Sequence, residues 1–336
     1  MPSFPWAAIH STLSHPSLAH NEWQTFQLSN QELHVEQETS LSYLLVFGVP
    51  IEAIEFDMLH ALFVQAGVKV LKAAIFQPTE ALLPAVVFAF NGDTAEVKAH
   101  LEVFKPQMNA QLVVVENPPC IQEAGLLVMD MDSTAIEIEC IDEIARLAGV
   151  YDEVSAVTAQ AMQGALEFSE SLRMRVAKLK GIEQSLIDEL KLQLPLMPGV
   201  KELCQYLQQH NWKLAIASGG FIPFAEQVQG LLNLDAIHAN ELEFEQQRLT
   251  GKVLGVIVDA QEKSRFLQHY AGTLGINIEQ TVAMGDGAND LVMMATAGLG
   301  VAVHGKPLVA KTADVAINTG SLLQVAYFLS FPRLID

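Results

Sequence analysis

Strand-like and helix-like stretches alternate along the first third of the chain. Apolar runs typical of strands occupy residues 42–49, 68–76, 83–90 and 110–115, and stretches with apolar residues at helical spacing occupy residues 54–65 and 93–104. This βαββαβ order predicts a ferredoxin-like α+β domain over residues 41–116. Residues 1–40 are polar and lack a clear periodicity, so they fit either a loose lead-in or an extra docked segment.

A different pattern begins after residues 117–124, which are expected to be a linker because Asn117-Pro118-Pro119 can continue neither a strand nor a helix. A short, wholly apolar run then occupies residues 125–129, and similar apolar runs follow at residues 213–217, 281–284, 299–303 and 315–317. Such runs are typical of parallel strands buried on both faces, and they predict a doubly wound, Rossmann-like α/β domain over residues 125–336. Residues 141–196 repeat at helical spacing, which predicts a helical cap inserted over the sheet.

Polar residues gather just after these apolar runs, where ligands bind in open parallel sheets. Asp130 and Asp132 follow the first run, Ser218 and Gly219 follow the second, Lys263 stands before a later helix, and Asp286, Asn289 and Asp290 follow the third. Each group alone is commonly a capped turn or a surface charge. Their joint occurrence, each at the end of an element, favours a catalytic site.

The residue types in this set fit phosphoryl transfer. A carboxylate such as Asp130 can attack phosphorus and form an acyl phosphate, and Asp132 can protonate the leaving oxygen and later take a proton from water. Ser218, the amide of Gly219 and the ammonium of Lys263 can hold the phosphoryl oxygens. The sequence therefore predicts a phosphatase.

Carboxylates that converge from separate strands form a hard oxygen site suited to Mg²⁺. We expect Asp130, Asp132 and Asp286 to be the metal ligands. Asp290 is expected to lie next to these ligands without binding the ion itself.

The runs 130–134, 218–220 and 285–290, together with Lys263, resemble the motifs of the haloacid dehalogenase superfamily. The resemblance covers about residue 125 to the C-terminus. Within the superfamily, an acid two residues after the nucleophile is similar to the phosphatase branch, so Asp132 implies a phosphatase.

A closer resemblance is to the bacterial phosphoserine phosphatases, through residues 139–143, 161–164 and 171–175. It implies hydrolysis of O-phospho-L-serine, the last step of serine biosynthesis. It also implies a substrate site in which Glu139 meets the ammonium and Arg175 the carboxylate. The remaining substrate contacts that it implies are Met162, Phe168 and Asn289.

The composition limits the alternatives. The chain has 336 residues, of which 39 are acidic and 19 basic, so its formal charge of −20 disfavours nucleic acid and anionic membranes as partners. The sequence shows no apolar run near the length of a membrane span and no secretory signal, so we expect a cytoplasmic protein. The three cysteines match neither a disulfide framework nor a zinc site.

Two other functions stay open at this point. One is a phosphatase or phosphotransferase for another small phosphomonoester, and the other is a non-catalytic sensor that binds amino acids. The element order of residues 41–116 resembles the ACT domains, which implies either regulation by serine or a structural role such as homodimer formation through exposed sheet edges. In the alternative, serine would inhibit as the product in the active site.

Overall fold

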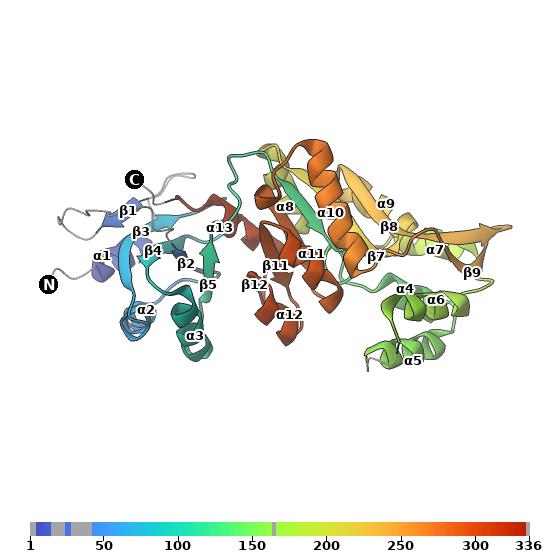
Figure 1. Cartoon of the computed structure of the whole chain (residues 1–336), viewed down its shortest axis with the longest axis horizontal. Coiled ribbons are helices and arrows are strands. Elements are labelled where there is room, and N and C mark those ends of the chain that lie inside the picture. Colours follow the sequence, from blue (N-terminus) through green and yellow to red (C-terminus); the bar gives the residue numbers. More distant parts are fainter. Residues whose placement is uncertain (1–4, 15–23, 28–41, 163–165, 334–336) are drawn as a thin grey trace. The chain divides into compact units, whose positions relative to one another are not determined.

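The computed structural model describes residues 5–14, 24–27, 42–162 and 166–333. The chain divides into two compact units (Figure 1). The first unit combines Met1–Pro118 with Leu323–Asp336, and the second unit is Pro119–Leu322. The predicted phosphatase domain of residues 125–336 includes Leu323–Asp336, which group with the first unit here.

The first unit contains a five-stranded sheet in the order β1-β3-β4-β2-β5, in which all neighbours are antiparallel. Its strands are β1 (Gln24–Gln27), β2 (Ser42–Phe47), β3 (Lys69–Phe76), β4 (Ala85–Asn91) and β5 (Gln111–Glu116). Its helices include α1 (Trp6–Ser14), α2 (Ala53–Gln65) and α3 (Thr94–Phe104). From β2 to β5 the chain follows the predicted βαββαβ order, and strand β1 extends the edge beside β3.

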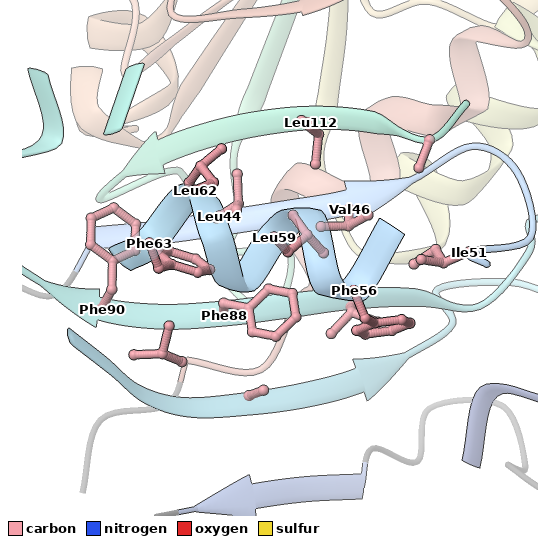
Figure 2. Close-up of a cluster of buried hydrophobic side chains, with 14 of the residues drawn as sticks. Leu44, Val46, Ile51, Phe56, Leu59, Leu62, Phe63, Phe88, Phe90 and Leu112 are labelled. Carbon is pink, nitrogen blue, oxygen red and sulfur yellow. The ribbon is translucent and has the colours of Figure 1, made fainter. Parts of the chain in front are cut away.

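The core of this unit lies between the sheet and its helices. Figure 2 shows side chains of α2 packed against alternate residues of the strands, and the labelled residues are Leu44, Val46, Ile51, Phe56, Leu59, Leu62, Phe63, Phe88, Phe90 and Leu112. The described parts of residues 1–40 join this core, because Ile9 is buried and the ring of Trp6 lies against Phe63 and Phe88. These parts are therefore a docked segment, and the other residues before Ser42 lie outside the described ranges.

The opposite face of the same sheet is covered by the C-terminal segment. Helix α13 (Val325–Ser330) lies beside β2, and the rings of Tyr327 and Phe328 pack against Phe47. The hydroxyl of Tyr327 donates a hydrogen bond of 2.6 Å to the carbonyl of Leu83. The ring of Phe331 continues the contact onto Tyr43. An antiparallel sheet needs cover on each apolar face, and here the chain supplies it from its far end.

The second unit is built on a seven-stranded sheet in the order β12-β11-β10-β6-β7-β8-β9. Its strands are β6 (Leu126–Met129), β7 (Lys213–Phe221), β8 (Ala236–Glu245), β9 (Arg248–Leu254), β10 (Thr281–Gly285), β11 (Leu299–Val303) and β12 (Val315–Ile317). Neighbours are parallel except β8 and β9, which pair antiparallel. The wholly apolar runs are strands as predicted, and the hairpin of β8 and β9 was missed.

Helices bury both faces of the central strands. Leu126 and Val128 face α10, α11 and α12, and the intervening Leu127 and Met129 are equally buried. The helices of the unit are α4 (Cys140–Leu147), α5 (Tyr151–Met162), α6 (Phe168–Lys178), α7 (Gln184–Lys191), α8 (Val200–Gln209), α9 (Ile222–Leu232), α10 (Ala260–Leu274), α11 (Leu291–Thr296) and α12 (Pro307–Thr312). The first four are the helices of the stretch over which a helical cap is predicted. Among the described helices, none is both long and apolar enough to cross a bilayer.

Candidate active site

Three neighbouring parallel strands, β10, β6 and β7, bring the candidate residues to one edge of the sheet. Asp130 follows β6 and Asp286 follows β10. The Ser218-Gly219-Gly220 run lies within the last part of β7, and Lys263 lies in the first turn of α10, where the sequence had placed both just outside their elements. The differences are local, because the residues still meet at the carboxyl ends of the strands.

Lys263 joins two of the acids. Its side chain is fully buried, and its Nζ atom lies 2.8 Å from Asp130 Oδ2 and 2.7 Å from Asp290 Oδ1. Burial lowers the pKa of Lys263, but the charges of Asp130 and Asp290 outweigh it and raise the pKa above its ordinary value. Lys263 is therefore a fixed positive charge within the site.

The carboxylate of Asp130 is held on both oxygens. Oδ1 accepts a hydrogen bond of 2.7 Å from the backbone N–H of Met131, and Oδ2 faces Lys263. The backbone N–H of Asp130 bonds to the carbonyl of Met284 on β10. A buried carboxylate held in one orientation at the end of a strand has the geometry of a nucleophile.

A second feature of the site is a cluster of three carboxylates. One oxygen each from Asp130, Asp286 and Asp290 lie within 4.8 Å of one another. Burial, with the charge of Asp130 as the next cause, raises the pKa of Asp286 to about 6 and that of Asp290 to about 7. A divalent cation would relieve this repulsion, and three converging oxygens are ligands that Mg²⁺ prefers. These three residues could therefore hold a metal ion.

The cluster differs from the predicted ligand set. The sequence placed the carboxylate of Asp132 among the ligands and Asp290 behind them, but in the described residues the group that converges contains Asp290 instead. Three residues past the end of β6, Asp132 turns toward β7, where its Oδ2 lies 3.0 Å from the position a β-carbon would take on Gly220. The spacing in the sequence does not reveal this direction.

The environment of Asp132 fits proton transfer. Its Oδ1 atom is buried and has no hydrogen-bond partner among the described residues. Burial and then the negative charge of Glu139 raise the pKa of Asp132 well above its ordinary value. A carboxyl group in such surroundings retains a proton that it can donate to a leaving group.

The Ser218-Gly219-Gly220 run passes close to these groups. A β-carbon on Gly219 would lie 2.8 Å from the ring of Phe168, and one on Gly220 would lie 2.6 Å from the side chain of Met131. Larger residues would therefore collide, and the glycines let the backbone approach the cap and the nucleophile loop. The Gly220 N–H bonds to the Ser218 hydroxyl oxygen at 3.0 Å.

The cap contributes opposite charges above this edge. Ser133 donates a hydrogen bond of 2.8 Å to Glu139, and Nε of Arg175 is buried with no acceptor among the described residues. Burial lowers the pKa of Arg175, while the charges of Asp142, Glu139 and Asp132 oppose this effect. The nearby acids thus offset part of the cost of burying the guanidinium, and its Nε–H stays a donor for a ligand.

The structure adds one charge to the predicted site, and the roles of Asn289 and Met162, like those of the other site residues, stay predictions. Asp142, which acts on Arg175, was not among the predicted site residues, although it stands in the 139–143 run that carried the resemblance. The Oδ1 atom of Asn289 crowds Gly287, at 2.2 Å from the position of a β-carbon there. Met162 ends helix α5, and its side chain lies outside the described residues.

Comparison with known proteins agrees with this geometry. The haloacid dehalogenase-like hydrolase family matches residues 125–298. A phosphoserine phosphatase of Haemophilus influenzae is 49% identical over 227 residues, which are 68% of this chain and 72% of that protein. The unliganded crystal structure of a probable phosphoserine phosphatase from Vibrio cholerae is 40% identical with a TM-score of 0.68 and covers 86% of each chain. A structure titled as a phospho-aspartyl intermediate analogue of phosphoserine phosphatase is 37% identical, with a TM-score of 0.58, over 62% of this chain and 99% of that one.

Proposed function

The chain belongs to the haloacid dehalogenase-like hydrolase family, and from this premise we propose that it hydrolyses O-phospho-L-serine to L-serine and phosphate. The observation that carries the proposal is the buried Asp130–Lys263 pair at the strand edge, with Asp132 beside it and Arg175 above it. The relatives named phosphoserine phosphatase support the substrate.

The first half of the reaction transfers the phosphoryl group to the enzyme. A carboxylate oxygen of Asp130 attacks phosphorus, and the bond between phosphorus and the serine oxygen breaks. Asp132 gives its proton to that oxygen as it leaves, so the leaving oxygen becomes the uncharged hydroxyl of serine. The product on the protein is an aspartyl phosphate at Asp130.

The second half returns the enzyme to its starting state. Asp132, now a carboxylate, takes a proton from a water molecule as the water oxygen attacks phosphorus. The bond from phosphorus to Asp130 breaks, and inorganic phosphate leaves. Asp132 ends protonated and Asp130 ends ionised, as both began.

The phosphoryl oxygens need positive groups throughout both steps. The ammonium of Lys263, the hydroxyl of Ser218 and the amide of Gly219 supply donors at the edge of the sheet, and the Gly220 amide holds the Ser218 hydroxyl oxygen. Asp130, Asp286 and Asp290 would hold a Mg²⁺ ion. When bound, this ion would neutralise negative charge on the nucleophile and on the phosphoryl group.

The charges of the cap fit the amino-acid part of the substrate. Arg175 can bind the carboxylate through its unpaired Nε, and Glu139 can accept hydrogen bonds from the ammonium. The ring of Phe168 lies against Gly219 and can cover the bound substrate. Contacts from Met162 and Asn289 stay predictions.

A phosphate-release assay tests this function directly. Phosphoserine, phosphothreonine and a sugar phosphate would be compared at equal concentrations with and without Mg²⁺. We expect phosphoserine to have the highest kcat/KM and chelation of the metal to abolish turnover. A higher kcat/KM for a substrate without the amino-acid group would favour another small phosphomonoester, and no turnover of any of them would favour the amino-acid sensor.

The first unit takes no part in this chemistry, because every candidate catalytic group lies in residues 130–290. Its ferredoxin-like sheet supports an ACT-like role in which it binds serine as a regulator, and dimer formation is the structural alternative. Serine inhibition and solution mass measured side by side would separate these roles. The cytoplasmic location likewise stays a prediction.

A further inference from the structure

Asn240 is a buried polar side chain that the reaction scheme above does not use. It lies in β8 and is 1% exposed. Its Nδ2 atom donates a hydrogen bond of 2.8 Å to the carbonyl of Gly219, and its Oδ1 atom accepts one of 2.9 Å from the N–H of Val258. One amide group therefore joins two backbone segments that are 39 residues apart in the sequence.

The first bond fixes the direction of a peptide group in the phosphate-binding run. In a trans peptide the C=O and the following N–H point in opposite directions. Because the Gly219 carbonyl points to Asn240, the Gly220 N–H points the other way, to the Ser218 hydroxyl oxygen at 3.0 Å. Rotation of this peptide would remove the hydrogen bond that fixes the Ser218 hydroxyl.

The second bond fixes the start of the helix that carries Lys263. Val258 directly precedes Asp259, whose side chain caps α10 by accepting a hydrogen bond from the N–H of Glu262 at 2.8 Å. The N–H of Lys263 bonds to the carbonyl of Asp259 at 2.9 Å. The position of Val258 is thus transmitted within one helical turn to the ammonium that contacts Asp130.

We propose that Asn240 is a positioning residue that holds the Ser218 hydroxyl, through the Gly220 amide, and the Lys263 ammonium in place for the phosphoryl group. The inference rests on the proposed function and deepens it. An amide side chain supplies a donor and an acceptor together, which neither an ionised carboxylate nor an alkyl group can do. Asn240 touches backbone atoms and not the reacting atoms, so its effect is exerted through the two groups that it holds.

The test compares Asn240→Asp and Asn240→Ala with a control, Thr281→Val. The Asp variant keeps the size and the acceptor but loses the donor to Gly219, and the Ala variant loses both bonds. Thr281 is also fully buried, donates to the carbonyl of Ile278 at 2.6 Å and accepts from the N–H of Gly298 at 3.2 Å, at the far end of β10. The control therefore removes similar hydrogen bonds away from the site.

Three quantities are measured in Mg²⁺ buffer: kcat/KM for phosphoserine, the Kd of inorganic phosphate by calorimetry, and Tm. We expect both Asn240 variants to lower kcat/KM by about 10- to 100-fold, less than the loss of an entire oxyanion donor, and to weaken phosphate binding by about 5-fold or more. Thr281→Val should lower Tm and leave both other quantities within about twofold of wild type.

The proposal is overturned if the Asn240 variants lower only Tm, if they resemble Thr281→Val in all three quantities, or if neither folds. Failure of the proposed function would look different. In that case the wild-type chain would not hydrolyse phosphoserine, yet its binding of inorganic phosphate would still depend on Asn240.

Discussion

Lys263 Nζ lies 2.8 Å from Asp130 Oδ2 inside the protein, and the lysine side chain is fully buried. Asp290 completes the arrangement at 2.7 Å from the same nitrogen, so one cation is shared by two acids. Such a site depends on every partner, because removal of one member of a buried ion pair leaves an uncompensated charge and costs about 3–5 kcal/mol.

Lys263→Met tests this dependence. It preserves length but leaves Asp130, Asp286 and Asp290 without their ammonium, so we expect turnover to fall at least about 100-fold. We also expect Tm without metal to drop, and added Mg²⁺ to raise the Tm of the variant more than that of wild type, because a cation would offset the same charges. The exposed pair of Lys213 with Asp235 provides the control Lys213→Met. Equal responses of the two variants to Mg²⁺ would argue against a metal at the acid cluster.

Asp130→Asn tests the nucleophile. The amide keeps the shape of the side chain but removes the attacking charge and one ligand of the acid cluster. We expect phosphoserine turnover to disappear. We also expect no aspartyl phosphate to be detected by mass spectrometry after a rapid acid quench. Substantial activity with an intermediate on another residue would refute the assignment.

Asp132→Asn tests the proton donor separately. The variant should lose about 10²- to 10⁴-fold in kcat for phosphoserine, which is the usual contribution of general acid–base catalysis. A substrate with a better leaving group, p-nitrophenyl phosphate, needs less protonation and should lose less in the step that forms the intermediate. The ratio of burst to steady-state rates measures this difference, and equal losses in both phases with both substrates would point to a role other than proton transfer.

Arg175→Ala tests recognition of the carboxylate. Loss of a charge-assisted contact of about 1.5–3 kcal/mol corresponds to about 10- to 150-fold in kcat/KM for phosphoserine. Phosphoethanolamine, which lacks the carboxylate, should change much less. Arg173 lies exposed on the same helix, so Arg173→Ala is a matched control that should change neither substrate. A similar loss for both phosphates would place Arg175 in support of the fold or the phosphoryl group.

The division of the chain tests how independently the units fold. A fragment of residues 119–322 should fold and retain metal-dependent activity, whereas residues 122–336 should aggregate more, because the second fragment carries α13 without the sheet that buries it. Light scattering and phosphate release measured on both fragments check this. If residues 119–322 fold but do not turn over phosphoserine, the first unit contributes to the chemistry after all.

The elements that could be predicted are those whose complete burial requires apolar residues along their whole length. Strand β6 is buried on both faces, so each of its residues Leu126–Met129 is apolar and the strand ends just before the first polar residue. Strand β8 has partly exposed residues and acids at alternate positions, which removes that signal. Helix α13 is apolar enough to predict that it is buried, but its sequence does not indicate that it packs against strand β2.

The same limit applies within the site. The residues that follow the strands could be identified because the edge of a parallel sheet is a general place for ligands. The directions of their side chains could not, which is why Asp132 and Asp290 exchanged places between the predicted and observed carboxylate clusters. Asn240 gave no signal, because its two bonds go to backbone atoms of segments far away in the sequence.

The contact of α13 with β2 also sets an order in time. Strands β2 to β5 leave the ribosome early, but the rings of Tyr327 and Phe328 that cover Phe47 follow only after residues 119–322. At roughly 5–20 residues per second this delay is on the order of 10–40 s. The second unit is synthesised during that interval, so the part of the protein that begins first in the sequence is completed last. Until then the nascent chain carries an aromatic sheet face that chaperones can bind, and synthesis that stops before residue 323 leaves it uncovered.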